Sequence, residues 1–270
     1  MTDWLAVCRS CGDGVAAALA GLPTRAEREV EVGTGMGGDQ TTAVDAAAEA
    51  AVVRVLEEEV SEGFTLVSEE LGERVFGDGG DGLRVVCDPI DGSLNAKRGF
   101  PLFALSLAVA DGPGMEDVFF AYVLDYGTGE EWTATRGEGA RLNGEPLAGP
   151  GPKDEVELCV IEATRTDLLA EAVGAFVGFA YRTRVFGSLA LSLCHLAAGR
   201  VDAACSLKPA RSVDIAAAQL LVRERGLAID LPEDAPFGRA RLDLVPRSRC
   251  VAAGTPEIAA ELWARLSGTG

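Results

Sequence analysis

Lysine and histidine are nearly absent from this sequence. The chain of 270 residues contains 3 lysines, 21 arginines and 1 histidine against 42 aspartates and glutamates, which gives a net charge of −18. A surface with this charge repels nucleic acids and anionic lipids, so we expect neither as a partner. Excess acid with scarce lysine is typical of proteins from salt-loving archaea, because high salt screens the repulsion between like charges. We therefore expect a halophilic source.

Long apolar runs are also missing. No stretch of about 18 uninterrupted apolar residues occurs, so the sequence predicts no membrane span. The first residues lack a basic segment followed by an apolar one, so a secretory signal is not predicted either. We expect a cytoplasmic protein.

Neither cysteine nor histidine forms a pattern typical of a reactive site. The seven cysteines are an odd number in a chain without a predicted secretion signal, and we expect them to be reduced. Cys8 and Cys11 have the Cys-x-x-Cys spacing, but no second pair accompanies them, so zinc or redox use is not favoured. The single histidine, His195, lies in an apolar helical segment, where packing is a better interpretation than a catalytic triad.

The periodicity of the apolar residues divides the chain into two halves of different type. Residues 1–150 are predicted to form helices at 5–20 and 42–59, followed by strands of an antiparallel sheet. The segment 147–152 is rich in Gly and Pro and is a linker by composition. In residues 151–270 strands and helices alternate, which predicts an α/β half and, for the whole chain, an α+β or α/β fold. The predicted elements after residue 100 are 103–110, 118–124, 131–135, 158–162, 166–176, 188–199, 202–206, 213–225, 249–253 and 256–266.

The hexapeptide Asp88-Pro89-Ile90-Asp91-Gly92-Ser93 places two carboxylates three positions apart after an apolar strand, 83–87. Proline removes a ladder donor and is predicted to end that strand, so that the Ile90 carbonyl turns outward. Gly92 permits a close backbone approach that a Cβ would block. If a helix or tight turn begins at Ser93, the free amides of residues 92–94 suit a phosphate oxygen.

Carboxylates and backbone amides that point toward the same position are typical of magnesium-assisted phosphoryl chemistry. Asp-Pro and Asp-Gly are also common turn formers, so the hexapeptide alone leaves both interpretations open. Further acids stand at the ends of other predicted elements. Glu69 and Glu70 follow a strand-like run, and Asp39 and Asp45 lie near a helix start. Asp214 opens an apolar helix-like run, where an ionised side chain is costly unless it is paired or bound to a metal.

Six motifs occur in a defined order along the chain. They are Thr41-Thr42-Ala43-Val44-Asp45, Ser68-Glu69-Glu70, Asp88 to Ser93 with Asn95, Gly137-Glu138-Gly139-Ala140-Arg141-Leu142-Asn143-Gly144, Gly187-Ser188, and Val213-Asp214-Ile215-Ala216-Ala217. In this order they resemble the inositol monophosphatase-like family, which includes fructose-1,6-bisphosphatases and dual-activity archaeal enzymes. The resemblance implies a layered αβαβα sugar-phosphatase fold. Its first half would carry most metal ligands, and its second half Asp214 and the substrate-binding residues.

The resemblance implies an enzyme, a phosphoric monoester hydrolase that uses two or three Mg²⁺ ions and is a homodimer. The implied metal ligands are Glu69, Asp88, the Ile90 carbonyl, Asp91 and Asp214, with Asp39 on a glycine-rich flap as a possible ligand of a third ion. The implied catalytic residues are Asp45 and Ser93, which activate the attacking water, and Glu70, which assists. The phosphate and substrate contacts predicted from the motifs and the free amides are Gly92, Ser93, Leu94, Gly187 and Ser188.

Basic residues stand near the motifs at two places, Lys97-Arg98 and Lys208 to Arg211. A bisphosphate brings a second dianion that fixed cations must match, so Lys208 and Arg211 are predicted to bind substrate. They could equally be surface charges. The roles of Lys97 and Arg98 stay open.

The predicted substrates are small phosphorylated sugars or polyols, first of all fructose 1,6-bisphosphate and inositol 1-phosphate. An alternative with the same chemistry is 3′-phosphoadenosine 5′-phosphate, and an alternative of another class is a catalytically silent metal-binding regulator. Gly33 to Gly38 matches the G-x-G-x-x-G expression, but the run before it is polar rather than a buried strand, so a dinucleotide enzyme is not favoured. Two departures from the family concern the substrate pocket. Ala96 stands where many relatives have an aromatic residue, and 205–211 lacks an acid that some relatives have.

Overall fold

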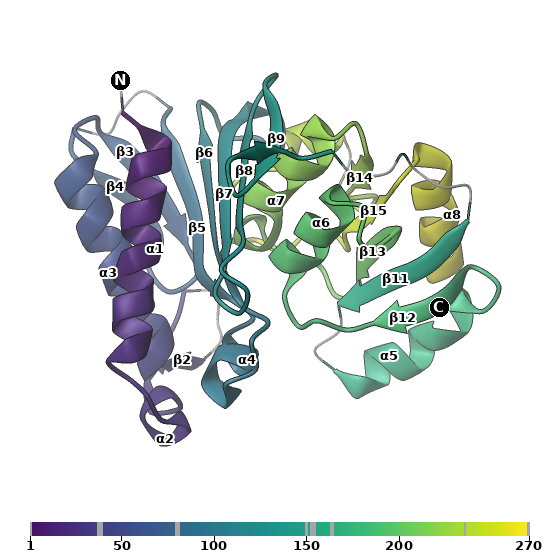
Figure 1. Ribbon diagram of the computed structural model, residues 1–270, viewed down its shortest axis with the longest axis horizontal. Coiled ribbons are helices and arrows are strands. Elements are labelled where there is room, and N and C mark those ends of the chain that lie inside the picture. Colours follow the sequence, from purple (N-terminus) through teal and green to yellow (C-terminus); the bar gives the residue numbers. More distant parts are fainter. Residues whose placement is uncertain are drawn as a thin grey trace.

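Five layers of helices and sheets follow one another across the molecule (Figure 1). The computed structural model describes residues 2–36, 40–78, 82–148, 151, 155–162, 165–234 and 236–268. The helices of these residues are α1 (Trp4–Ala20), α2 (Arg25–Arg28), α3 (Ala43–Glu59), α4 (Ser93–Arg98), α5 (Thr166–Ala172), α6 (Leu189–Ala197), α7 (Ser212–Glu224) and α8 (Pro256–Ser267), with 3-10 turns at Met115–Asp117, Val173–Phe176 and Phe237–Arg239. Among these described helices, none is long and apolar enough to cross a membrane.

The larger sheet has eight strands in the order β10-β9-β8-β7-β6-β5-β3-β4. Its strands are β3 (Phe64–Ser68), β4 (Gly72–Phe76), β5 (Arg84–Asp91), β6 (Ala104–Ala110), β7 (Val118–Asp125), β8 (Glu131–Thr135), β9 (Gly139–Leu142) and β10 (Glu145–Pro146). Neighbouring strands are antiparallel, except that β3 and β5 are parallel. Helices α1 and α3 cover one face, and α6 and α7 cover the other (Figure 1). The predicted antiparallel sheet with two flanking helices is thus confirmed, apart from one parallel pair.

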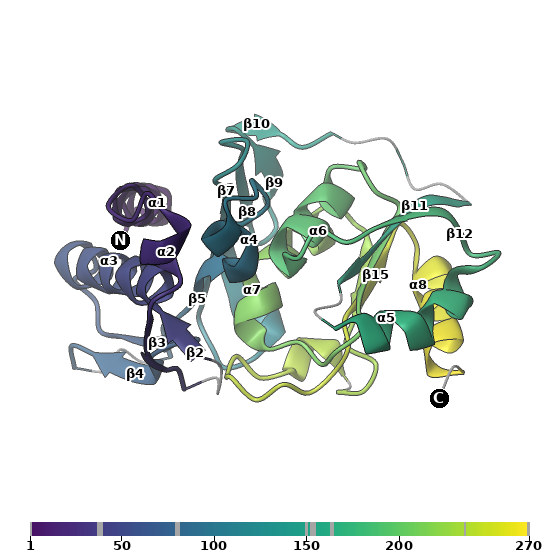
Figure 2. The same ribbon diagram turned by 90° about the horizontal axis from the view of Figure 1, so that it is seen from below.

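The smaller sheet has five strands in the order β12-β11-β13-β15-β14. Its strands are β11 (Val156–Glu162), β12 (Ala180–Arg184), β13 (Ala203–Ser206), β14 (Ala228–Asp230) and β15 (Val251–Ala253). Helices α5 and α8 cover its outer face, while α6 and α7 separate it from the larger sheet (Figures 1 and 2). The layered αβαβα arrangement is therefore confirmed. The sequence pattern does not predict β12, which is an exposed polar edge strand, or β14, which has three residues.

A short two-stranded sheet precedes α3. It pairs β1 (Glu31–Thr34) with β2 (Gln40–Thr42), so the first two residues of the glycine-rich segment Gly33 to Gly38 belong to a strand. Thr42 then forms the N-terminal cap of α3, whose described start agrees with the predicted one to within a residue.

The strand that carries the hexapeptide runs further than the sequence predicts. β5 continues through Pro89 to Asp91, so the predicted strand end before Pro89 is wrong. The register of β5 against β6 shifts between Asp88 and Asp91. Pro89 lies in this irregular stretch, where the ladder does not require its missing N–H. The chain leaves the sheet at Gly92 instead, and helix α4 begins at Ser93, which meets the condition set for the free amides.

One hydrophobic core lies between the two sheets and joins the two halves of the chain. Val86, Val123 and Trp132 of the larger sheet belong to it together with Leu193 of α6 and Leu220 of α7. The second half contributes helices α6 and α7 to one face of the larger sheet, so both halves share this core. The division of the chain into two domains at residue 150 stays a prediction.

The cysteines and the histidine have structural positions. All seven cysteines are buried and carry free thiols. Cys8 and Cys11 lie on the core side of α1, and burial raises the pKa of the Cys8 thiol and brings that of Cys11 to about 12. The ring of His195 packs edge-on against Trp132 and Phe186, which agrees with the predicted packing role.

Candidate active site

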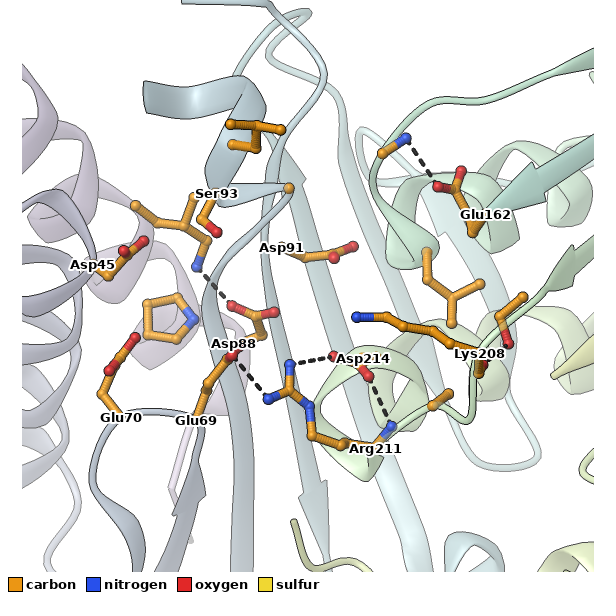
Figure 3. A pocket seen from close by; sticks show the side chains of 18 of the residues that line it. Asp45, Glu69, Glu70, Asp88, Asp91, Ser93, Glu162, Lys208, Arg211 and Asp214 are labelled. Atoms are coloured by element: carbon orange, nitrogen blue, oxygen red, sulfur yellow. Dashed lines mark hydrogen bonds and ion pairs between the residues drawn. The ribbon is translucent and has the colours of Figure 1, made fainter. Parts of the chain in front are cut away.

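A pocket of about 340 Å³ opens beside the end of β5 and is lined by both halves of the chain (Figure 3). The acids of its lining are Asp45, Glu69, Glu70, Asp88, Asp91, Glu162 and Asp214. Its cations are Lys97, Lys208 and Arg211. Acids outnumber bases here, and a cleft lined by one sign of charge concentrates ions of the opposite sign. The pocket is therefore suited to cations, or to anions that arrive together with cations.

Gly92 shapes the turn between β5 and α4. Its φ of 92° lies in the left-handed region that favours glycine. A Cβ at this position would stand 2.9 Å from the Leu102 carbonyl oxygen and 3.1 Å from the Gly187 carbonyl oxygen. The expected close backbone approach is thus confirmed. The first amides of α4, at Ser93 and Leu94, have no acceptor within the helix and lie at the pocket.

Two acids of β5 are almost completely buried. Asp88 is 5% exposed and accepts a hydrogen bond from the Ile90 amide at 2.9 Å. Asp91 is 8% exposed and accepts from the Ser188 hydroxyl at 2.6 Å and from the Ala190 amide at 2.7 Å. Burial raises the pKa of Asp91 to about 7, and burial followed by the nearby carboxylates raises the pKa of Asp88 well above its usual range. Both acids would ionise more readily beside a bound cation.

Arg211 lies between the acids of the two halves (Figure 3). Its Nη1 is 2.8 Å from Glu69 Oε1, and its Nη2 is 3.4 Å from Asp214 Oδ1. Its backbone amide donates to Asp214 Oδ2 at 2.7 Å. Within the described ranges no three carboxylate, thiol or imidazole groups already stand together as a finished metal site. The oxygen donors that a hard cation prefers are nevertheless gathered in one pocket.

Asp45 and Glu70 form the wall of the pocket next to α3. Asp45 Oδ2 accepts from the Thr42 amide at 3.2 Å and from the Thr42 hydroxyl at 2.5 Å. Lys97 Nζ lies 3.0 Å from the same oxygen, in an ion pair that is largely shielded from solvent. Glu70 accepts a hydrogen bond from the Thr41 hydroxyl. Burial raises the pKa of Glu70, while this hydrogen bond and the charge of Lys97 act in the opposite direction.

Glu162 and Asn95 fix the segment that precedes α6. Glu162 accepts from the amides of Phe186 at 3.2 Å and Gly187 at 2.9 Å, and from the Ser192 hydroxyl at 2.6 Å. Asn95 Nδ2 donates to the Phe186 carbonyl at 2.7 Å. Burial raises the pKa of Glu162 to about 7. This segment leads directly into the residues that hold Asp91.

Two acids of the site are missing from the sequence-based prediction. Glu162 ends the apolar strand β11, so the reasoning used for Glu69 could have found it. Glu49 is buried on α3 and accepts from the Ser68 hydroxyl and, at 3.4 Å, from the Leu71 amide. It thereby holds both sides of the Glu69-Glu70 turn. A glutamate inside a helix gives no sequence signal of such a role.

Most of the remaining predicted site residues lie at the pocket. Ile90, Gly92, Ser93, Leu94, Gly187 and Lys208 line the pocket. Ser188 is buried and reaches the site through its bond to Asp91. Asp39 lies outside the described residues, so its flap stays a prediction. Arg98 forms an exposed ion pair with Glu29.

Comparison with known proteins establishes the class of this protein. The chain belongs to the inositol monophosphatase family, whose model matches residues 6–268. The fructose-1,6-bisphosphatase/inositol-1-monophosphatase of Archaeoglobus fulgidus is 32% identical over 257 residues, which cover 93% of each protein. The Nus factor SuhB of Escherichia coli is 37% identical over 196 residues, 70% of each protein.

A solved structure of an inositol monophosphatase-fructose 1,6-bisphosphatase has the same fold. Its TM-score is 0.83 at 24% identity, and the match covers 98% of this chain and 100% of that one. The family and the names of its members make this protein a phosphatase, a phosphoric monoester hydrolase that acts on a small phosphorylated substrate. The predicted family, fold and enzyme class are confirmed.

Proposed function

We propose that the protein is a Mg²⁺-dependent phosphatase that hydrolyses fructose 1,6-bisphosphate, inositol 1-phosphate or both. The observation that carries this proposal is the meeting of Asp88, Asp91 and Asp214 in one pocket beside the free amides of α4. The names of two archaeal relatives, from Archaeoglobus fulgidus and Methanothermobacter thermautotrophicus, pair the same two activities and support the choice of substrates.

The acids of the pocket fit magnesium by their chemistry. Mg²⁺ prefers oxygen ligands, and a divalent ion would offset the burial and mutual repulsion that raise the pKa of Asp88 and Asp91. Glu69, Asp88 and the Ile90 carbonyl would hold one ion, and Asp88, Asp91 and Asp214 a second, with two or three ions in all. When bound, Mg²⁺ lowers the pKa of a water molecule and offsets charge on phosphoryl oxygens.

Asp45 and Ser93 are assigned to the attacking water. Asp45 takes the proton of this water through the Ser93 hydroxyl, and Glu70 assists. Asp45 and Ser93 lie on the same side of the pocket, which supports this assignment (Figure 3). The bonds of Asp45 to Thr42 and Lys97 hold its carboxylate in place for this step.

The start of α4 is assigned to the phosphoryl group. The amides of Gly92, Ser93 and Leu94 hold the phosphoryl oxygens during an in-line displacement, which needs no covalent intermediate. Gly187 borders the same turn and is assigned to the sugar or polyol, whereas the predicted substrate contact of Ser188 is not retained, because its buried hydroxyl binds Asp91 instead. Lys208 reaches into the pocket beside Asp214 and is assigned to the second phosphate of a bisphosphate (Figure 3).

Phosphate release from fructose 1,6-bisphosphate and from inositol 1-phosphate, measured side by side with Mg²⁺ and then with excess chelator, tests the proposal. Release from at least one substrate that stops with chelator is the expected result. If the protein binds Mg²⁺ but releases phosphate from neither substrate, a panel that includes 3′-phosphoadenosine 5′-phosphate decides between another substrate and a catalytically silent regulator.

We also propose a homodimer in the cytoplasm of a salt-loving archaeon. The acid excess of the chain and the archaeal sources of several relatives support this habitat. Light scattering coupled to size-exclusion chromatography, in low salt and in molar KCl, is expected to give twice the 28.1 kDa chain mass.

A further inference from the structure

Arg211 uses the same carboxylate oxygens that metal ions would need. Its guanidinium contacts one oxygen of Glu69 and one of Asp214, and its own amide contacts the other Asp214 oxygen. Both oxygens of Asp214 are therefore bonded to the same arginine. The two acids are assigned to different ions, so one side chain spans both proposed metal positions.

The charges around Arg211 show why the guanidinium stays there. Its side chain is 13% exposed; burial acts to lower its pKa, but the charges of Asp214, Glu69 and Asp88 together raise it above its ordinary value. Conversely, the charge of Arg211 lowers the pKa of Glu69 against the effect of burial. Buried acids without a counterion are strongly destabilising. Arg211 is thus a counterion of these acids.

A divalent ion that coordinates Glu69 Oε1 or Asp214 Oδ1 competes with the guanidinium for that oxygen. An oxygen that coordinates a metal directs its lone pair toward the ion, and two cations at contact distance from one carboxylate repel each other. The contact of Nη2 with Asp214 Oδ1, at 3.4 Å, is the longest of the three and would open most easily. The amide contact with Oδ2 can persist, because it holds Asp214 at the start of α7 without adding a full charge.

We propose that Arg211 is a positioning residue that holds Glu69 and Asp214 together in the metal-free enzyme and leaves them when Mg²⁺ binds. This inference rests on the proposed magnesium dependence. Mg²⁺ binding and the release of Arg211 from the two acids are then one coupled equilibrium. The apparent affinity for Mg²⁺ is then lowered by the fraction of molecules in which Arg211 still occupies the acids. In return, the metal-free protein keeps its acids close together without unpaired charge.

Mg²⁺ titration by calorimetry and thermal unfolding with and without Mg²⁺ test the inference on Arg211→Met. This variant keeps an unbranched side chain of similar length and removes the charge. We expect it to bind Mg²⁺ at least about tenfold more tightly than the wild type. Without metal it should melt several degrees lower, and saturating Mg²⁺ should remove most of this difference. Arg98→Met removes the same charge from an exposed ion pair outside the pocket and should match the wild type in both measurements.

Arg211→Lys provides a second variant if Arg211→Met does not fold. A lysine ammonium contacts one carboxylate at a time, whereas the guanidinium fork spans two. Its Mg²⁺ affinity should lie between those of the wild type and Arg211→Met, or above the wild type if only the lysine variant folds. Mg²⁺ binding by the wild type with equal or weaker binding by the Arg211 variants overturns this inference alone. Absence of Mg²⁺ binding by every protein overturns the proposed magnesium dependence, and the inference with it.

Discussion

The two halves of the chain contribute to the pocket in different ways. The first half supplies acids, among them Asp45 and Asp88, on a helix and a strand that neighbouring elements hold rigidly. The second half supplies Asp214 and two side chains that bind acids of the first half. The hydroxyl of Ser188 bonds Asp91, and the guanidinium of Arg211 bonds Glu69.

This division shows how the cost of gathering buried acids in one pocket is offset. Like charges that come together in a low-dielectric pocket oppose folding, and backbone amides, hydroxyls and a guanidinium offset that cost. In this protein, the partners of two of these acids, Asp91 and Glu69, come from the other half of the chain. The site therefore requires both halves in their final places, which the core shared by the two sheets provides.

The largest expected effect is on an acid of the first half. Asp88→Asn should lower the Mg²⁺-dependent turnover by at least about 10³-fold, roughly 4 kcal/mol in the barrier, because the amide brings no negative charge to a position shared by both ions. Steady-state phosphate release by the folded variant measures this. Asp78→Asn, at an exposed acid outside the pocket, is the matched control. More than about a tenth of wild-type turnover in Asp88→Asn would contradict the metal assignment.

A smaller loss is expected for the acid assigned to the water. Asp45→Asn should lower turnover by about 10²-fold or more, the range typical of a lost general base, while Mg²⁺ affinity changes little. Titration of Mg²⁺ against turnover separates the two quantities. Weakened Mg²⁺ binding with an unchanged rate at saturation would move Asp45 into the metal-binding set.

The pH dependence of the unfolding free energy tests whether Glu162 and Asp91 titrate near pH 7 in the folded protein. Burial raises the pKa of Glu162, and of Asp91 in the first half, to about 7. An acid whose pKa is higher in the folded than in the unfolded protein stabilises the fold while it is protonated. This stabilisation is complete below the pKa of the unfolded state and is lost as the pH rises through the pKa of the folded state, here about 7. The metal-free protein should therefore be less stable at pH 8 than at pH 5.

Glu162→Gln removes one of these titrating groups. The loss of unfolding free energy between pH 5 and pH 8 should shrink by roughly 2 kcal/mol relative to the wild type. Denaturant unfolding at both pH values, in chelator, measures the difference. An identical loss in the two proteins would show that Glu162 does not titrate in this range.

The smallest expected effect separates two substrates. Lys208→Ala should raise KM for fructose 1,6-bisphosphate about tenfold and leave inositol 1-phosphate nearly unchanged, because only the bisphosphate presents a second dianion. Arg182→Ala, at an exposed cation of the edge strand β12, controls for the change in net charge. Equal losses on both substrates would assign Lys208 a shared or structural role.

The sequence predicts those parts of the molecule that depend on local patterns. The continuous or alternating apolar runs of β6, β7 and β8 and the acids at strand ends are local, and the structure brings these acids into one pocket. The bulge that carries β5 past Pro89 is not local, because it depends on pairing with β6. The polar edge strand β12 likewise exists only because β11 pairs with it.

The partners of the acids could not be predicted from the sequence. Lys97 stands four residues after the end of the hexapeptide, yet its contact with Asp45 depends on how α4 lies relative to α3. Arg211 stands three residues before Asp214, but its bond to Glu69 crosses more than half the chain. The sequence analysis predicts a substrate contact for this arginine, whereas in the structure its guanidinium contacts two acids, Glu69 and Asp214.

The buried thiols give each of the three hydrophobic cores of the described residues its own reporter of opening. Cys8 and Cys87 lie in the core beneath α1 and α3, and Cys159 and Cys205 in the core beside α5 and α8. An alkylating reagent reacts with a thiolate and therefore only after a buried cysteine becomes exposed. Alkylation rates for single cysteines, read by mass spectrometry, thus measure how often each core opens. Cys194 lies in the core between the sheets, so its rate indicates whether the outer layers open separately or only when the whole protein unfolds.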